Sequence, residues 1–169
     1  RYFARNLNDT FKVGENSEIR CNAINDHEKI TTRQLEYFEN KGDKNGHEVV
    51  HLQHTSWGDW QLPRTKGIRK ILEQVRTSEG PVMVHCSDGL GRTGAFVYTE
   101  KLLQAIHFSK NEDGKVDHGD LLREMRETRA CCIQQAENLM VPIMIVLDMF
   151  FEKIEGENLK LVYTIDKKN

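Results

Sequence analysis

Apolar residues in the middle of the chain recur with the spacing of an amphipathic helix. Ile71, Leu72 and Val75 lie three, four and seven positions after Ile68, and charged residues stand between them. Side chains at these intervals share one face of a helix, whereas strict alternation would indicate a strand. The pattern therefore predicts a helix over residues 66–76.

Two segments upstream of this helix have the composition of strands. They run from Thr31 to Phe38 and from Val49 to Thr55. Residues 40–48 between them are polar and contain an Asn-Gly step, which is a strong turn signal. We expect the two segments to form a long hairpin.

A short apolar run and a glycine-rich turn follow the predicted helix. Residues 82–84 read Val-Met-Val, which is typical of a buried strand. Residues 89–94 hold three glycines and should form a tight turn. A second helix is expected from about Ala95 to Phe108.

The remainder of the chain is mostly helical by pattern. Residues 111–119 are a polar loop, and Leu121 opens a third helix that ends in arginines. A final helix covers roughly residues 139–154, and its apolar residues on most faces predict deep burial. Pro142 should lie in the first turn of this helix. The charged tail, 155–169, has no assigned structure.

Length and charge exclude some classes of function. The 169 residues suit one domain, and 24 basic against 26 acidic side chains give a net charge of −2. Nucleic-acid binding needs a concentrated basic surface, so we expect none. The most apolar run, 139–151, contains Asp148 and is shorter than the roughly 20 residues of a membrane span. Because the chain begins with Arg and opens without a signal peptide, we expect a fragment or a processed piece.

Cysteine and histidine usage predicts neither a disulfide framework nor a metal site. Cys131 and Cys132 are adjacent, and no Cys-x-x-Cys pair exists. This usage favours a reducing, intracellular compartment. The seven histidines form no set with ligand spacing, so we expect neither a metal nor another cofactor.

The segment with most chemical information lies between the predicted buried strand and the second helix. Residues 85–94 read His-Cys-Ser-Asp-Gly-Leu-Gly-Arg-Thr-Gly. Backbone amides at the start of a helix are unpaired and can converge on one anion, and glycines permit the tight backbone this needs. Arg92, six residues after Cys86, can offer a bidentate fork to two phosphate oxygens.

The same surroundings favour an ionised sulfur. A thiol that faces loop amides and a guanidinium ionises below its usual pKa of about 8.5. We therefore expect Cys86 to be a thiolate nucleophile, with Thr93 stabilising it when it becomes a leaving group. The alternative is that Cys86 is an ordinary buried thiol.

This order of residues resembles the H-C-x5-R-[S/T]-G signature of the cysteine-dependent protein-tyrosine phosphatases. The match is complete at His85, Cys86, Arg92, Thr93 and Gly94. The resemblance implies that the loop and a nearby tryptophan bind the substrate phosphate, through Ser87, Asp88, Gly89, Leu90, Gly91, Arg92 and Trp57.

A second resemblance lies upstream, where Trp57-Gly58-Asp59 precedes Pro63. It is similar to the mobile Trp-Pro-Asp loop of the family, whose aspartic acid protonates the leaving tyrosyl oxygen. Asp59 would take this role; the alternative is an ordinary aspartate of a surface loop. Gly58 replaces the family's proline, and the looser hinge should slow proton transfer.

A third resemblance lies in residues 126–138, which are similar to the family's R-x-x-R-x4-Q-x3-Q segment. Gln134 matches the first glutamine, which positions the water that hydrolyses the phosphocysteine. Asn138 replaces the second glutamine. It could serve the same site, or it could equally cap the final helix.

The resemblance extends from about Tyr2 to about Ile154 and favours the classical, tyrosine-specific branch. It implies an α/β fold with a mixed twisted sheet flanked by helices, and residues 155–169 as a C-terminal tail. It also implies that the N-terminal part of the family domain is lacking, including the loop that lines the phosphotyrosine slot. The expected partner is a phosphotyrosine protein, met in the cytoplasm or by the cytoplasmic part of a receptor-type protein.

Asp88 opposes activity, because active relatives carry a small apolar residue there. Its carboxylate would repel the phosphate and the thiolate, by about 4 kcal/mol at 4 Å if buried but only about 1 kcal/mol if solvated. Three hypotheses follow: a working phosphatase, an impaired pseudophosphatase that binds phosphotyrosine or another protein, and a sulfur- or arsenate-handling protein. Only the first two explain Asp59 and Gln134.

Overall fold

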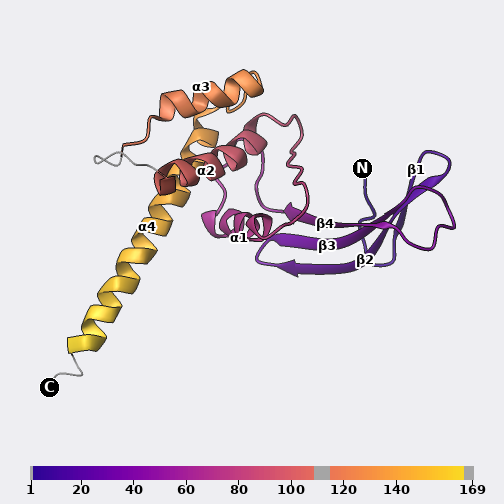
Figure 1. Ribbon diagram of the computed structural model, residues 1–169, viewed down its shortest axis with the longest axis horizontal. Coiled ribbons are helices and arrows are strands. Elements are labelled where there is room, and N and C mark those ends of the chain that lie inside the picture. Colours follow the sequence, from indigo (N-terminus) through magenta and orange to yellow (C-terminus); the bar gives the residue numbers. More distant parts are fainter. Residues whose placement is uncertain (1, 109–114, 166–169) are drawn as a thin grey trace. The chain divides into compact units, whose positions relative to one another are not determined.

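The computed structural model describes residues 2–108 and 115–165, with side chains up to residue 154. The chain divides into two compact units, residues 1–56 and residues 57–169, which we describe separately. The first unit contains the sheet and the second contains the helices (Figure 1).

The first unit is a four-stranded antiparallel sheet in the order β1-β2-β3-β4. Its strands follow one another along the chain: β1 (Thr10–Val13), β2 (Ser17–His27), β3 (Ile30–Phe38) and β4 (His47–His54). The predicted hairpin is confirmed, because β3 pairs with β4 in the register Leu35↔Val49. The described sheet contains no parallel pair, so its pairing is simpler than the mixed sheet that we expected.

A two-residue turn joins β2 to β3. Glu28 and Lys29 both have positive φ, 50° and 67°, and His27 pairs directly with Ile30. This backbone matches the twist of a hairpin, which offsets the cost of left-handed non-glycine residues. On one face of the sheet Phe3, Ala4, Cys21 and Leu35 are buried against each other.

The second unit contains four helices: α1 (Thr65–Arg76), α2 (Gly91–Phe108), α3 (His118–Thr128) and α4 (Ala136–Ile165). One core cluster joins α1, α2 and α4 through Ile68, Leu72, Ala95 and Ile145, with Trp57 beside them. A second cluster joins α2 to α3 through Tyr98, Leu102 and Met125. Since α2 contributes to both clusters, it is the central helix of this unit.

The predicted helices are confirmed, but α2 and α3 start earlier than expected. α2 begins at Gly91 rather than Ala95, because the amide of Gly94 already donates to the carbonyl of Leu90 (3.2 Å). α3 begins at His118 because Asp117 accepts from the amides of Gly119 and Asp120 (2.8 and 3.0 Å). The predicted polar loop 111–119 lies partly outside the described residues.

The strand predicted over residues 82–84 is wrong. These residues adopt no regular structure, and the Met83 side chain is 89% exposed. No strand pairs with them among the described residues, so the ladder that would bury an apolar run is not formed.

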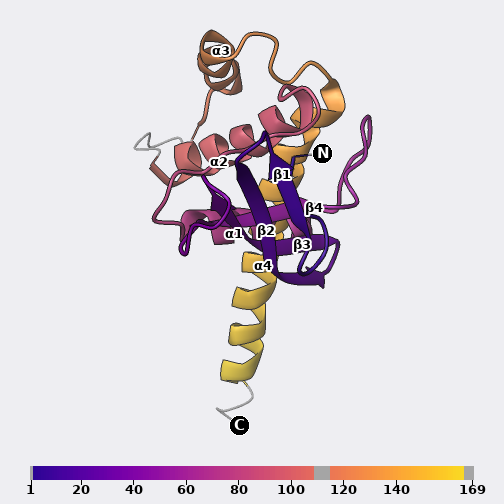
Figure 2. The ribbon, with the colours of Figure 1, turned by 90° about the vertical axis from the view of Figure 1, so that its right-hand side faces the viewer.

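The deep burial predicted for the last helix is confirmed for Val141 and Ile145 but is wrong for its later residues. Leu147, Phe150 and Phe151 are about half exposed (47%, 57% and 57%), and the C-terminal half of α4 projects away from α1, α2 and α3 (Figure 1, Figure 2). The helix begins six residues before Pro142, so the proline lies in its interior and not in its first turn. The described residues contain no helix that is both long and apolar enough to cross a membrane.

The core position of Ile145 gives a prediction about stability. Its side chain is fully buried (0% exposed) in the cluster of α1, α2 and α4. Ile145→Ala should lower the free energy of unfolding by about 2 to 5 kcal/mol, because it removes apolar contacts and leaves a cavity. Phe150→Ala on the exposed face of the same helix should change it by less than about 1 kcal/mol. Urea denaturation measures both, and equal losses would contradict the described packing.

Candidate active site

The loop between residues 85 and 91 leads directly into the first turn of α2. Gly89 has φ +74°, a left-handed conformation that favours glycine. A Cβ atom there would lie 2.5 Å from Nη2 of Arg129, so this position has no room for a larger residue while Arg129 keeps its place. Arg129 donates to the carbonyl of Asp88 (3.3 Å) and so holds the loop from outside.

Arg92 points back over this loop from the first turn of α2. Its Nη2 donates to Ser87 Oγ (3.1 Å) and its Nη1 to the carbonyl of Trp57 (3.0 Å). Nη2 also forms an ion pair with Asp59 (2.5 Å). The guanidinium therefore joins the loop of residues 85–91 to the loop of Asp59.

The surroundings of Cys86 lower the pKa of its thiol overall. Burial acts first and raises the pKa, but the nearby hydroxyl and amide of Thr93 and the amide of Gly89 outweigh it. Thr93 Oγ1 is buried and meets no partner at full hydrogen-bond geometry among the described residues. Its proton is thus free to turn towards the sulfur when the thiol ionises.

Asp88 points into the loop. Its Oδ1 atom accepts hydrogen bonds from the Cys86 thiol (3.3 Å) and from the amide of Leu90 (2.9 Å). The contact raises the pKa of Cys86 but does not reverse the net decrease. The pKa of Asp88 is itself lowered, chiefly by the Leu90 amide and then by the Cys86 thiol. The carboxylate is solvent-exposed, so its repulsion is that of the weaker, solvated case.

The loop of Asp59 is held by buried residues on both sides, Trp57 and Pro63, while its middle is exposed. Trp57 is buried (8% exposed) and its Nε1 donates to the carbonyl of Gln61 (3.1 Å). Trp60, directly after Asp59, is 74% exposed and has φ +62°. Asp59 is thus presented from an exposed turn beside a fixed tryptophan.

The glutamine segment, residues 126–138, packs through its backbone against the loop of residues 85–91. The Ile133 amide donates to the carbonyl of Leu90 (3.1 Å). Arg126 fixes this segment by donating to the carbonyls of Cys132 and Ile133 (3.2 and 3.0 Å). Cys131 and Ile133 have left-handed backbones (φ 62° and 57°), which turn the chain towards the loop before α4.

A small cavity of about 30 Å³ lies where the three segments meet. It is lined by Asp59, Trp60, Asp88, Gly91, Arg92, Gln134, Gln135 and Asn138. The predicted residues Asp59, Arg92 and Gln134 therefore share one cavity. Trp60 and Gln135 were missed, although each directly follows a predicted site residue in the sequence.

Asn138 does not cap the final helix. It is the third residue of α4, is buried, and donates through Nδ2 to Gln135 Oε1 (3.4 Å). A Cβ atom on Gly91 would lie 2.8 Å from this Nδ2, so Asn138 packs closely on the start of α2. The capping alternative is wrong, and Asn138 belongs to the wall of the site.

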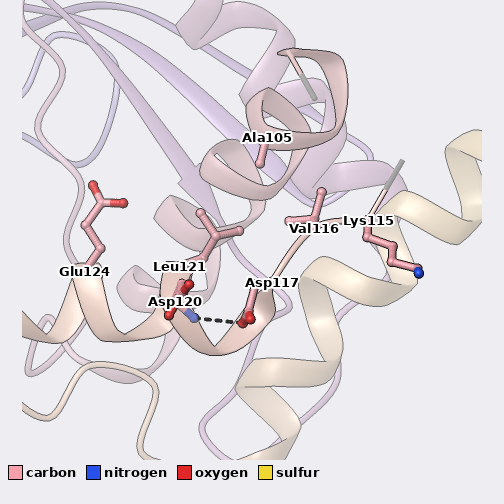
Figure 3. A pocket seen from close by; sticks show the side chains of 7 residues that line it. All are labelled: Ala105, Lys115, Val116, Asp117, Asp120, Leu121 and Glu124. Carbon is pink, nitrogen blue, oxygen red and sulfur yellow. Dashed lines mark hydrogen bonds between the residues drawn. The ribbon is translucent and has the colours of Figure 1, made fainter. Parts of the chain in front are cut away.

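A larger cavity of about 310 Å³ lies elsewhere in this unit (Figure 3). It is lined by Ala105, Lys115, Val116, Asp117, Asp120, Leu121 and Glu124. None of the residues that the sequence singles out for catalysis or phosphate binding lines it. The small cavity beside Arg92 is therefore the candidate active site.

Comparison with known proteins shows the family to which this chain belongs. The family model described as "Protein-tyrosine phosphatase" matches residues 1–148. The chain belongs to the protein-tyrosine phosphatase family. Tyrosine-protein phosphatase non-receptor type 7 of Mus musculus is 32% identical over 126 residues, which cover 71% of this chain and 33% of that protein. Receptor-type tyrosine-protein phosphatase C of Rattus norvegicus is 29% identical over 127 residues, 70% of this chain and 10% of that protein.

A solved structure of the family shares the fold. The crystal structure of a protein tyrosine phosphatase from Trypanosoma cruzi matches with a TM-score of 0.74 and 25% identity, over 89% of this chain and 54% of that one. The α/β fold class is therefore confirmed. This tyrosine phosphatase chain spans about half of that structure and a third or less of the two curated relatives above.

The lowered pKa of Cys86 gives a prediction about reactivity. Its alkylation by iodoacetamide should reach half its maximal rate at a lower pH in the folded chain than in the urea-unfolded chain, because only the thiolate reacts. Thr93→Val should move this midpoint upwards, since it removes a hydroxyl that stabilises the anion. Mass spectrometry of the peptide that contains Cys86 reports the rate. Coincident midpoints for folded and unfolded chains would contradict the described hydrogen bonds.

Proposed function

We propose that this chain hydrolyses phosphotyrosine in proteins through a phosphocysteine intermediate. One observation carries the proposal: Arg92 contacts both the loop of Cys86, through Ser87, and Asp59 on a second loop. The guanidinium of Arg92 and the carboxyl group of Asp59 line one cavity, and the loop that carries Cys86 contributes Asp88 to the same lining. Family membership makes phosphotyrosine the expected substrate.

In the first step the Cys86 thiolate attacks phosphorus. A new S–P bond forms, and the bond between phosphorus and the tyrosyl oxygen breaks. Arg92 and the loop amides hold the phosphoryl oxygens, which stabilises the charge that is spread over them. Protonated Asp59 gives its proton to the tyrosyl oxygen, so tyrosine leaves as a neutral phenol.

In the second step water attacks the phosphocysteine. Gln134 would orient this water from the cavity wall, and the Asp59 carboxylate would accept one of its protons. The S–P bond breaks, inorganic phosphate forms, and sulfur leaves as a thiolate. The Thr93 hydroxyl stabilises that thiolate, which makes it a better leaving group.

An impaired pseudophosphatase is the second candidate function. It is favoured by the contact of Asp88 with Cys86, which raises the pKa of the nucleophile and places a negative charge beside it. Gly58 in place of proline adds to this, because the loop of Asp59 is then less restrained. Such a protein would bind phosphotyrosine or another protein segment but would turn over slowly.

The remaining assignments follow from this function. The partner is a phosphotyrosine protein rather than a nucleic acid, and the reaction needs no cofactor. We place the chain in the cytoplasm, free or as the cytoplasmic part of a receptor-type protein, since relatives of both kinds match it. Residues 1–154 form the phosphatase part and residues 155–169 the tail, although the backbone of α4 continues across this boundary.

Replacing the nucleophile tests the proposed function. Cys86→Ser should abolish hydrolysis of p-nitrophenyl phosphate by the 169-residue chain, because a serine hydroxyl is not ionised at neutral pH. Cys131→Ser is the matched control, since Cys131 is exposed and lies outside the 85–94 motif. It should retain the parent activity in a phosphate-release assay. Activity that survives Cys86→Ser would refute the proposed chemistry.

The role of Asp59 gives a prediction that depends on the leaving group. Asp59→Ala should lower kcat for phosphotyrosine by about 10²- to 10⁴-fold, because the phenolate must then leave unprotonated. The loss should be much smaller for p-nitrophenyl phosphate, whose leaving group is a weaker base. Steady-state kinetics with both substrates measure this. Equal losses in kcat, or a loss confined to KM, would show that Asp59 is not the acid.

A further inference from the structure

We propose that Asp88 is an internal ligand of the phosphate loop, which an incoming oxyanion must displace. This inference rests on the proposed function, because it concerns the same anion site. It differs from simple repulsion: the carboxylate does not merely lie near the phosphate position but takes up a hydrogen-bond donor that the phosphate needs.

The contacts of one oxygen atom carry this inference. Asp88 Oδ1 lies 3.3 Å from Cys86 Sγ and 2.9 Å from the amide nitrogen of Leu90. An oxygen of a bound phosphate must also lie near the nucleophilic sulfur and accept amides of this loop. Asp88 Oδ1 thus already makes two contacts that a substrate oxygen requires.

The guanidinium side of the site is occupied in the same way. Nη2 of Arg92 pairs with Asp59 at 2.5 Å and also donates to Ser87 Oγ. Without a substrate, both the amide donor and the arginine are therefore satisfied by carboxylates of the chain itself. A phosphate dianion therefore has to displace the carboxylates of Asp88 and Asp59. Of these two residues, only Asp59 has a role in the proposed chemistry.

The backbone around Asp88 favours its inward position. Oδ1 of Asp88 reaches the amide two residues ahead, as aspartate side chains commonly do in turns. Arg129 holds the carbonyl of Asp88 from outside the loop at 3.3 Å. The side chain is solvent-exposed, so it can swing out into water when an oxyanion enters. The internal ligand should thus weaken anion binding without blocking it.

Sulfate binding to the 169-residue chain tests the inference, because sulfate remains a dianion near neutral pH and is not turned over. Isothermal titration calorimetry should show that Asp88→Ala binds sulfate about 10- to 100-fold more tightly, the range expected for freeing a hydrogen bond to a charged group. Asp88→Asn should gain clearly less, because its amide oxygen can still accept the Leu90 amide. Asp120→Ala removes the same charge from α3, outside the site, and should leave the affinity unchanged.

The outcomes separate this inference from its alternatives. Equal gains for Asp88→Ala and Asp88→Asn would mean that charge alone acts, which would overturn the internal-ligand assignment, and so would an unchanged affinity for Asp88→Ala. The Leu90 amide signal in ¹⁵N NMR gives a second readout. It should move when Asp88 is replaced by Ala and move again when sulfate is added. Failure of turnover in the parent chain would refute the proposed function but would leave these binding results intact.

Discussion

The start of α2 sets the chemistry of this molecule. Amides in the first turn of a helix have no partner within the helix, and here they follow a tight loop whose Gly89 is left-handed. Arg92 adds a full positive charge at the same place. The hydroxyl and amide of Thr93 and the amide of Gly89 lower the pKa of Cys86 against the effect of burial, while Arg92 pairs with Asp59 and the Leu90 amide holds Asp88.

The packing of the second unit serves to hold this turn. α2 lies between α1, α3 and α4 in two apolar clusters, so its first turn is fixed by the burial of residues such as Ala95 and Tyr98. The glutamine segment fixes the other side through the Ile133 amide, which donates to the carbonyl of Leu90. The loop is therefore held by backbone contacts on both sides, while the side chains that face the cavity, apart from the buried Asn138, remain exposed or half-buried.

Arg92 and the loop amides also attract carboxylates of the protein itself, which compete with an incoming anion. Asp59 is useful at Arg92, since a proton donor must lie near the leaving oxygen. Asp88 has no such role, yet it accepts hydrogen bonds from the Cys86 thiol and from the Leu90 amide. If the proposed function holds, the balance between these two carboxylates and an incoming phosphate would decide whether the site turns over quickly or mainly binds.

Much of this could be predicted from sequence. The 85–94 motif, the amphipathic spacing of α1 and the β3–β4 hairpin depend on local spacing, and all three are found in the structure. The exposed 82–84 segment could not be predicted, because burial of an apolar run depends on whether another strand pairs with it. The same holds for α4, where Phe150 is 57% exposed although Glu152, two residues further along the helix, still pairs with Arg69 of α1. The direction of the Asp88 side chain and the roles of Trp60 and Gln135 in the cavity needed coordinates.

The most direct test of the account is to trap the covalent intermediate. The chain would be mixed rapidly with an aryl phosphate, quenched in acid and digested, and the peptide that contains Cys86 would be weighed by mass spectrometry. We expect a phosphoryl adduct on Cys86 that forms within one turnover and accumulates when Gln134 is replaced by Ala. Release of phosphate without any adduct on Cys86, or an adduct on another residue, would contradict it.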